Sequence, residues 1–205
     1  MDVAKSFVCF VVVGYVLCCG VGDSVGQDRF ESVVIVDCDG KMGTGFCVSD
    51  DSESVEVWTV GHVTGEVGSE AVIVFSGGRR STGVVSWRSY DGKPDGEDQA
   101  KIVCPRPDGE VSTIRVCEDD CGAHKSLTFV GARLGMVGQR QVRVRVQDDE
   151  LIKGRVIAFP GSSKGDSGGP VVNRDRAVVG VVSQCTVERF PRLLFIPIDK
   201  WRDCE

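Results

Sequence analysis

Several features that other classes of protein require are scarce or missing in this sequence. It has only two histidines, His62 and His124, among 205 residues. It carries no block of basic residues and its formal net charge is −6, so the electrostatic footprint of a nucleic-acid-binding protein is missing. No repeat is present, and no 11-residue window keeps a helical period except the tail after Pro197. The sequence therefore argues against nucleic acid as a partner and against a helical fold.

Valine and glycine are abundant instead, with 37 and 26 residues. Valine fits the pleated surface of a strand, and glycine serves the turns between short strands. The β-rich runs are Ser32–Cys38, Thr44–Val48, Val55–Val60, Ala71–Phe75, Gly83–Trp87, Gln99–Val103, Ser112–Val116, Leu127–Gly131, Gln141–Val146, Leu151–Phe159, Pro170–Val172, Ala177–Ser183 and Leu193–Ile198. Many short strands at close spacing predict an all-β sandwich or barrel, and the length fits one domain or two tightly packed halves.

The N-terminal residues have the pattern of a targeting segment. Lys5 precedes an apolar run, Phe7–Cys19, which is too short to cross a membrane as a helix but is typical of a signal peptide. We therefore predict a signal peptide at 1–26, cleaved between Gly20 and Gln27. The protein is then secreted or periplasmic, with no membrane association after cleavage.

An odd number of cysteines remains after the signal peptide. They are Cys38, Cys47, Cys104, Cys117, Cys121, Cys185 and Cys204. A secreted protein uses cysteines mainly in disulfides, and an odd number leaves at least one thiol unpaired or joined to another chain. Cys38 and Cys47 flank a tight turn in adjoining strands, which suggests a cross-strand disulfide, and Cys185 could pair with Cys204.

A second group of cysteines has two interpretations. Cys104, Cys117, Cys121 and His124 have a spacing that imperfectly matches a zinc site. The secreted context favours a disulfide that staples this connecting segment, so no metal is predicted.

The string Gly-Asp-Ser-Gly-Gly-Pro at 165–170 has the properties of a nucleophile loop. Its glycines permit backbone angles closed to other residues and let a substrate chain approach closely. Such a turn can expose the Ser167 hydroxyl and aim the amides of Gly165 and Ser167 at one point, as a tetrahedral oxyanion requires.

A serine needs a base, and the base needs an acid. His62 ends a strand-like run upstream of the serine, whereas His124 lies in a cysteine-rich loop and is expected to be a solvated surface residue. Asp98 fits the acid best because it opens a strand after a polar loop. The competing acids in that loop, expected to be solvated, are Asp91, Asp95 and Glu97.

These motifs resemble those of the chymotrypsin-like (trypsin-like) serine peptidases over nearly the whole chain after the signal peptide. The details are similar to the HtrA/Deg-type branch, through Gly-Thr-Gly-Phe at 43–46, Phe-Ile-Pro-Ile at 195–198, and Val63 after His62 in place of a disulfide cysteine. A PDZ domain, typical of that branch, is not expected here. The resemblance implies an all-β fold of two perpendicular six-stranded antiparallel β-barrels with the active site in the cleft between them. It implies a peptidase domain at 27–205, with a first barrel at about 30–108, a connector at about 105–125 and a second barrel at about 126–205.

The resemblance also implies roles for the residues of the site. His62 would be the general base, Asp98 its orienting acid and Ser167 the nucleophile, with the amides of Gly165 and Ser167 as the oxyanion hole. No cofactor is implied, and the partner is a protein or peptide substrate.

Asp166 marks a departure from the digestive enzymes of this superfamily. In those enzymes it pairs with a new N-terminus, but no Ile-Val-Gly-Gly-like segment follows a basic residue here. A buried unpaired carboxylate is costly. We therefore expect a local cation or polar shell, with Lys164 or a nearby arginine as candidates.

Part of the substrate pocket can also be inferred from the resemblance. Gly161 stands where trypsin-like enzymes carry the aspartate that selects Arg or Lys, so strong basic preference is not expected. Ser183, Gln184 and Cys185 resemble the strand that pairs with an extended substrate. A side chain at Cys185 would narrow the pocket, which suggests cleavage after small or medium apolar residues such as Ala, Val or Thr.

Two classes of function fit the sequence. The first is a secreted serine endopeptidase, because motif, base, acid and chain order agree. The alternative is a catalytically inactive homologue that binds peptides or proteins through the same cleft. The sequence indicates no oligomeric state.

Overall fold

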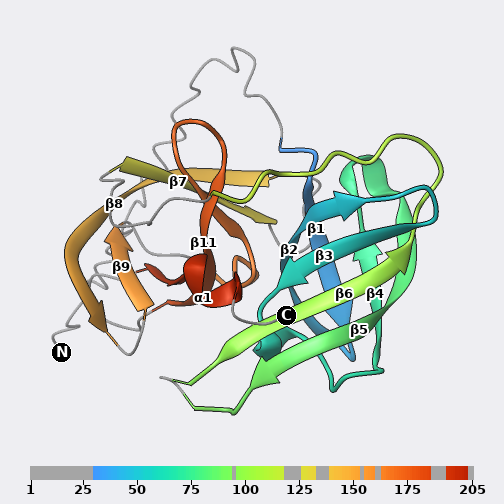
Figure 1. Ribbon diagram of the computed structural model, residues 1–205, viewed down its shortest axis with the longest axis horizontal. Coiled ribbons are helices and arrows are strands. Elements are labelled where there is room, and N and C mark those ends of the chain that lie inside the picture. Colours follow the sequence, from blue (N-terminus) through green and yellow to red (C-terminus); the bar gives the residue numbers. More distant parts are fainter. Residues whose placement is uncertain are drawn as a thin grey trace, which may run out of the picture.

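Two closed β-barrels form the molecule, one from each half of the chain (Figure 1). Each barrel has six strands, and every strand pairs antiparallel with its neighbours. This confirms the predicted all-β fold with two six-stranded antiparallel barrels. The computed structural model describes residues 30–93, 96–117, 126–132, 139–152, 155–159, 163–185 and 193–202.

The first barrel follows the order β1-β2-β3-β6-β5-β4. Its strands are β1 (Val33–Cys38), β2 (Lys41–Asp50), β3 (Ser54–Thr59), β4 (Glu70–Val74), β5 (Arg80–Tyr90) and β6 (Asp98–Pro105), with short 3-10 turns η1 (Gly61–Val63) and η2 (Ser76–Gly78). Alternation fixes which face is inside: Val55 and Val57 are buried, whereas Glu56 between them is only partly buried. Asp39 and Gly40 have φ values of 53° and 74°, so they close the β1–β2 hairpin as a two-residue turn.

The second barrel follows the order β10-β11-β12-β9-β8-β7. Its strands are β7 (Ser126–Ala132), β8 (Gln139–Ile152), β9 (Arg155–Phe159), β10 (Pro170–Val172), β11 (Val178–Cys185) and β12 (Leu193–Pro197). Leu127, Phe129 and Val144 belong to the cluster of buried side chains inside this barrel. A four-residue helix, α1 (Asp199–Arg202), follows β12. No helix among the described residues is long and apolar enough to cross a membrane.

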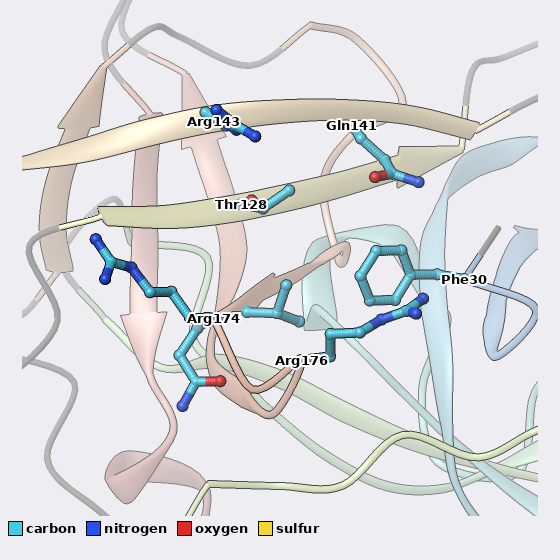
Figure 2. A pocket seen from close by; sticks show the side chains of 8 residues that line it. Phe30, Thr128, Gln141, Arg143, Arg174 and Arg176 are labelled. Carbon is cyan, nitrogen blue, oxygen red and sulfur yellow. The ribbon is translucent and has the colours of Figure 1, made fainter. Parts of the chain in front are cut away.

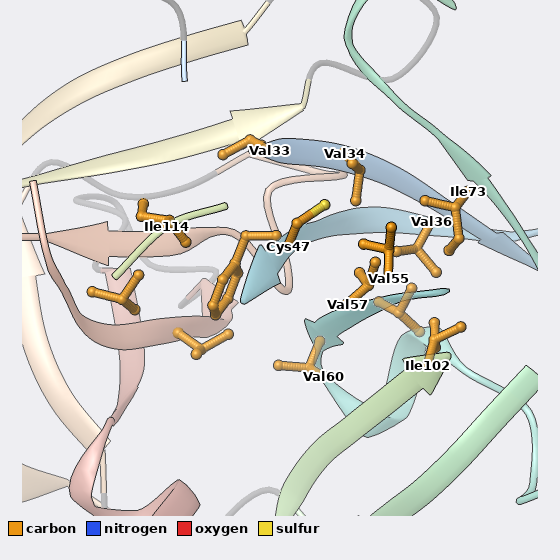
Figure 3. Close-up of a cluster of buried hydrophobic side chains, with 14 of the residues drawn as sticks. Val33, Val34, Val36, Cys47, Val55, Val57, Val60, Ile73, Ile102 and Ile114 are labelled. Carbon is orange, nitrogen blue, oxygen red and sulfur yellow. The ribbon is translucent and has the colours of Figure 1, made fainter. Parts of the chain in front are cut away.

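A second apolar cluster fills the first barrel and extends to the other one (Figure 3). It joins first-barrel residues such as Val36 and Ile102 to Val130 and Val181 of the second barrel. Full burial of a valine or isoleucine stabilises the fold by roughly 1.5–3 kcal/mol. This shared core therefore holds the two barrels in a fixed relation.

The segment Ser112–Val116 is not the strand that its composition predicts. It makes only an isolated bridge between Val116 and Val178, and the Ile114 amide donates to the Cys47 carbonyl at 2.9 Å. Ile114 and Val111 are buried in the cluster that joins the barrels. These apolar residues fill the space between the barrels, and the segment pairs with β11 only through the single bridge at Val178.

The predicted disulfide between Cys38 and Cys47 is wrong, because both are free thiols. The hairpin register pairs Cys38 with Lys41 and Val33 with Phe46, which places the two cysteines at opposite ends of the ladder. At ~3.3 Å per residue they are about 20 Å apart, far beyond the span of a disulfide.

Cys104 and Cys117 cannot share a metal site or a disulfide either. Cys104 is buried in the core of the first barrel and Cys117 in the core of the second, and both are free thiols. Within the described part of the chain no group of His, Cys, Asp or Glu could hold a metal ion. Cys121, His124 and Cys204 lie outside the described residues, as does the predicted signal peptide.

Candidate active site

His62 and Asp98 come from two neighbouring strands of the first barrel. His62 lies in η1, which follows β3 directly, and Asp98 is the first residue of β6. Because β3 and β6 are paired, with Thr59 opposite Ala100, the end of one strand meets the beginning of the other. The two side chains therefore meet at one end of the barrel.

Two hydrogen bonds join Asp98 to His62. The backbone amide of His62 donates to Oδ1 of Asp98 at 2.9 Å, and Nδ1 of the ring lies 2.9 Å from Oδ2. The Asp98 side chain is 2% exposed, whereas the His62 side chain is 31% exposed. Asp98 thus fixes the ring from the buried side, and the accessible side of the imidazole remains open for chemistry.

The pKa of Asp98 reflects opposing influences. Burial raises the pKa, but the hydrogen bonds and the charge of His62 and a hydrogen bond from Ser183 outweigh it, so the pKa lies below its usual value. The Ser183 hydroxyl donates to Oδ2 at 2.6 Å from the second barrel. Asp98 is therefore a carboxylate that can orient the imidazole and stabilise an imidazolium.

Ser167 lies in the loop before β10, between the two barrels. Its hydroxyl donates to the carbonyl oxygen of Ser183 at 3.3 Å. In the part of the chain that the structure describes, no hydrogen bond joins this hydroxyl to His62. Proton transfer to the ring requires the hydroxyl to turn away from Ser183, and such contacts often tighten only when substrate is bound.

The Ser167 loop presents two unused backbone donors. The amide of Asp166 donates to Ser163 and that of Gly168 to Val182, both within the fold. The amides of Gly165 and Ser167, which alternate with these two along the chain, donate to none of the described residues. Gly165 has a φ of 95°, which other residues rarely adopt, and this backbone angle shapes the loop. Two neighbouring amides without partners are suited to an oxyanion.

Thr44 of β2 anchors this loop across the interface between the barrels. Its hydroxyl donates to the carbonyl of Gly165 at 2.6 Å and accepts from the amide of Ala132 at 2.8 Å. Its own amide donates to the carbonyl of Ser167 at 2.7 Å. Thr44 is fully buried, so its hydroxyl is satisfied by these two contacts and holds the Gly165 peptide in one orientation.

Asp166 is buried beside Ser167 and has a backbone partner. The amide of Ser163 donates to its Oδ2 at 2.6 Å. Lys164, expected as a partner, is exposed and makes no ion pair with a described residue. The carboxylate also lies against Gly131, where a Cβ atom would come within 2.1 Å of its Oδ1. The shell around Asp166 thus includes a main-chain amide in place of the expected lysine.

The other acids of the polar loop point to solvent. Asp91 is exposed and lies 3.5 Å from Nζ of Lys93, and exposed Glu97 accepts from the hydroxyl of Ser89. Asp95 lies outside the described residues.

Three of the four residues predicted to line the substrate pocket lie in one strand. Ser183 and Gln184 lie in β11, where Gln184 pairs with Leu194 of β12. Cys185 lies at the end of the same strand, and Gly161 is outside the described residues. Sequence reasoning missed two contacts here: the hydroxyl of Ser183 binds Asp98, and Thr44 anchors the loop. Thr44 had a signal, since it is the polar residue within the Gly-Thr-Gly-Phe string.

Comparisons with known proteins agree with this geometry. The trypsin family model matches residues 117–203. The Rv3671c protease of M. tuberculosis, in its inactive form, has a TM-score of 0.65 at 19% identity, over 85% of this chain and 87% of that chain. The serine endoprotease from Yersinia pestis has a TM-score of 0.67 at 16% identity, over 84% and 61% of the two chains. No curated protein matches the chain in sequence.

At these identities the structural likeness shows a shared fold. The residues that the trypsin family model matches, 117–203, include Ser167 and its loop. The chain therefore has the chymotrypsin-like fold of two six-stranded β-barrels, and its residues 117–203 are similar to the trypsin family.

Proposed function

We propose that this protein is a secreted serine endopeptidase in which His62, Asp98 and Ser167 form the catalytic triad. One observation carries the proposal: the amides of Gly165 and Ser167, between the barrels that supply the base and the nucleophile, donate to none of the described residues. Two such donors in one loop suit the oxyanion of a tetrahedral intermediate.

The mechanism follows from the roles of these residues. His62 takes the proton of Ser167 as the hydroxyl attacks a peptide carbonyl, and the amides of Gly165 and Ser167 donate to the oxyanion. Collapse breaks the peptide bond, the amine leaves with the proton from His62, and an acyl-enzyme remains. Water, deprotonated by His62, then hydrolyses the ester and regenerates Ser167. Asp98 keeps its negative charge throughout and stabilises the imidazolium.

We further propose cleavage after small or medium apolar residues. The uncharged Gly161 and the side chain at Cys185 support this preference, and Ser183 to Cys185 would pair with the extended substrate. Profiling with a peptide library should show Ala, Val or Thr before the cleaved bond. Cleavage dominated by Arg, Lys or Phe at that position would contradict the pocket, while leaving the triad intact.

Secretion is the third part of the proposal. Lys5 and the apolar run Phe7–Cys19 support a signal peptide at 1–26. N-terminal sequencing of the exported protein should find a start between residues 21 and 27. A mature protein that retains Met1 would contradict it.

An inactive, peptide-binding homologue is the second candidate. The observation that favours it is the hydrogen bond from the Ser167 hydroxyl to Ser183 in place of one to His62. The two candidates differ in turnover, since only the enzyme cleaves a peptide that it binds. Cleavage by the wild type that disappears in Ser167→Ala, with peptide binding retained, decides for the enzyme.

A further inference from the structure

A second concave site lies on the second barrel and shares no residue with the triad or the Ser167 loop (Figure 2). Its volume is about 470 Å³. The lining residues are Phe30, Thr128, Gln141, Arg143, Val172, Asn173, Arg174 and Arg176. Three of the eight carry a positive charge and none carries a negative one, in a protein whose net charge is −6.

The floor of this pocket is the outer face of the sheet β10-β7-β8. Val172 pairs with Thr128, and Thr128 pairs with Arg143, so the three occupy adjacent positions across the strands. Their chain neighbours Val171 and Phe129 belong to the core inside the barrel. Because side chains alternate along a strand, Val172, Thr128 and Arg143 lie on the opposite, outer face.

One wall of the pocket is the tight turn between β10 and β11. Oδ1 of Asn173 accepts from the amides of Asp175 and Ala177, each at 3.0 Å, and Arg176 has a φ of 60°. These bonds fix the turn that carries Arg174 and Arg176. Figure 2 shows the Arg176 side chain extending toward Phe30, while Arg174 extends the other way. The Arg176 guanidinium lies 4.3 Å from the centre of the Phe30 ring.

The charges of this pocket are not balanced from within. Arg143 and Arg174 are exposed, and neither forms an ion pair with any residue that the structure describes. The acidic neighbours in the chain, Glu31 and Asp175, do not line the pocket. Like charges around one cavity raise its positive potential, which attracts an anionic ligand.

We propose that this pocket binds an acidic peptide segment that carries at least two Asp or Glu side chains. A guanidinium presents parallel N–H groups that match a carboxylate in a bidentate contact. Phe30 and Val172 are buried, and the Asn173 amide is already bonded to Asp175, Ala177 and Cys117. The exposed guanidinium groups of Arg143 and Arg174 are therefore the part of the lining that meets the ligand. A short acidic peptide complements these two charges, whereas the net charge of −6 opposes a long polyanion such as nucleic acid or a sulfated polysaccharide.

The position of the pocket relates it to the active site. Ser167 lies before β10 and Asn173 directly after it, so the two ends of this stretch are within about 20 Å at ~3.3 Å per residue. A protein substrate held at Ser167 could therefore place an acidic segment in the pocket. This last step rests on the proposed function, whereas binding of the segment does not.

Binding is best measured on the protein carrying Ser167→Ala, in which no peptide is cleaved. The probe is a fluorescent octapeptide with four glutamates, and the same peptide with four glutamines is the control. By anisotropy, we expect the glutamate peptide alone to bind, with an affinity that falls as salt is added. The double variant Arg143→Gln/Arg174→Gln should weaken its binding about tenfold.

A matched double variant separates the pocket from overall charge. Arg80→Gln/Arg115→Gln removes the same charge from exposed positions that do not line the pocket, and it should change the affinity less than about twofold. Equal binding of both peptides, or equal loss in both double variants, overturns the proposal. So does binding of inorganic phosphate or a sulfated oligosaccharide without binding of the glutamate peptide. Loss of all peptidase activity would contradict the proposed function but not this binding.

Discussion

The two barrels contribute to the active site in different ways. The first barrel supplies side chains, since Asp98 holds His62 through two hydrogen bonds at the meeting point of paired strands. The second barrel supplies a loop whose chemistry comes from Ser167 and from backbone amides. Strand pairing alone can place a side chain, but a loop needs extra anchors. Thr44 of the first barrel is such an anchor for the loop, and Ser183 of the second barrel bonds across the interface to Asp98.

The contribution of side chains from the first barrel is tested most strongly at Asp98. Asp98→Asn should lower kcat by about four orders of magnitude, because the neutral amide favours the wrong imidazole tautomer and cannot stabilise the imidazolium. Steady-state kinetics on one peptide substrate measure the effect. Asp91→Asn and Glu97→Gln, at exposed acids of the same loop, should change kcat less than about twofold, and a loss below tenfold in Asp98→Asn would mean that another acid acts.

The core of the first barrel contains two buried thiols that make its stability sensitive to alkali. Burial raises the pKa of Cys47 to about 12, aided by Cys104 and Asp50, and burial raises that of Cys104 to about 11, from an ordinary value of 9.0. The folded state therefore holds these protons more tightly than the unfolded state. The stabilisation that these protonated thiols contribute is fully present below pH 9 and is lost as the pH rises toward 11 and 12.

The Cys47 thiol alone should cost roughly 2 kcal/mol of unfolding free energy between pH 9 and pH 11. Urea unfolding at several pH values measures this slope. Cys47→Ala/Cys104→Ala removes both thiols, so its stability should fall less steeply over the same range. Parallel slopes for the variant and the wild type would show that these thiols do not titrate during unfolding.

The contribution of the backbone amides in the second barrel is tested at Thr44. Its hydroxyl holds the loop that carries these amides. Thr44→Val removes the hydroxyl but keeps the shape, so the Gly165 peptide loses its anchor and kcat should fall roughly tenfold to thirtyfold, with KM little changed. Thr44→Ser restores the hydroxyl and should recover most of the activity. If Thr44→Val lowered only thermal stability, Thr44 would be structural and would not position the loop.

The smallest effect is expected at an ion pair on the surface of the first barrel. Nη1 of Arg88 lies 2.8 Å from Oε1 of Glu66, whose side chain is 85% exposed. Glu66→Gln should change the unfolding free energy by less than about 1 kcal/mol, because solvent screens the pair. Activity should be unchanged, although Arg88 also donates to Gly61 beside His62. A larger loss in chemical denaturation would show that this edge of the barrel depends on charge.

The sequence could predict features that depend on local patterns, but it could not predict contacts between distant residues. Alternating valines and Asp-Gly turns identified the strands, and the string at 165–170 identified the loop, because both are local patterns. The Cys38–Cys47 disulfide failed because the spacing of two cysteines does not give the register of their strands. Thr44 and Ser183 bond to Gly165 and Asp98, residues 121 and 85 positions away, and such contacts leave no local pattern.

The most direct test of the account is covalent labelling of Ser167 by a fluorophosphonate probe. The reaction requires the base in the first barrel and the nucleophile and loop amides in the second, so it depends on both halves at once. The wild type should be labelled at Ser167 in neutral to mildly alkaline solution, and Ser167→Ala and His62→Ala should not be. A folded wild-type protein that is never labelled between about pH 6 and pH 9 would contradict the account. This range extends above the ordinary pKa of histidine, so it includes conditions in which an imidazole can act as a base.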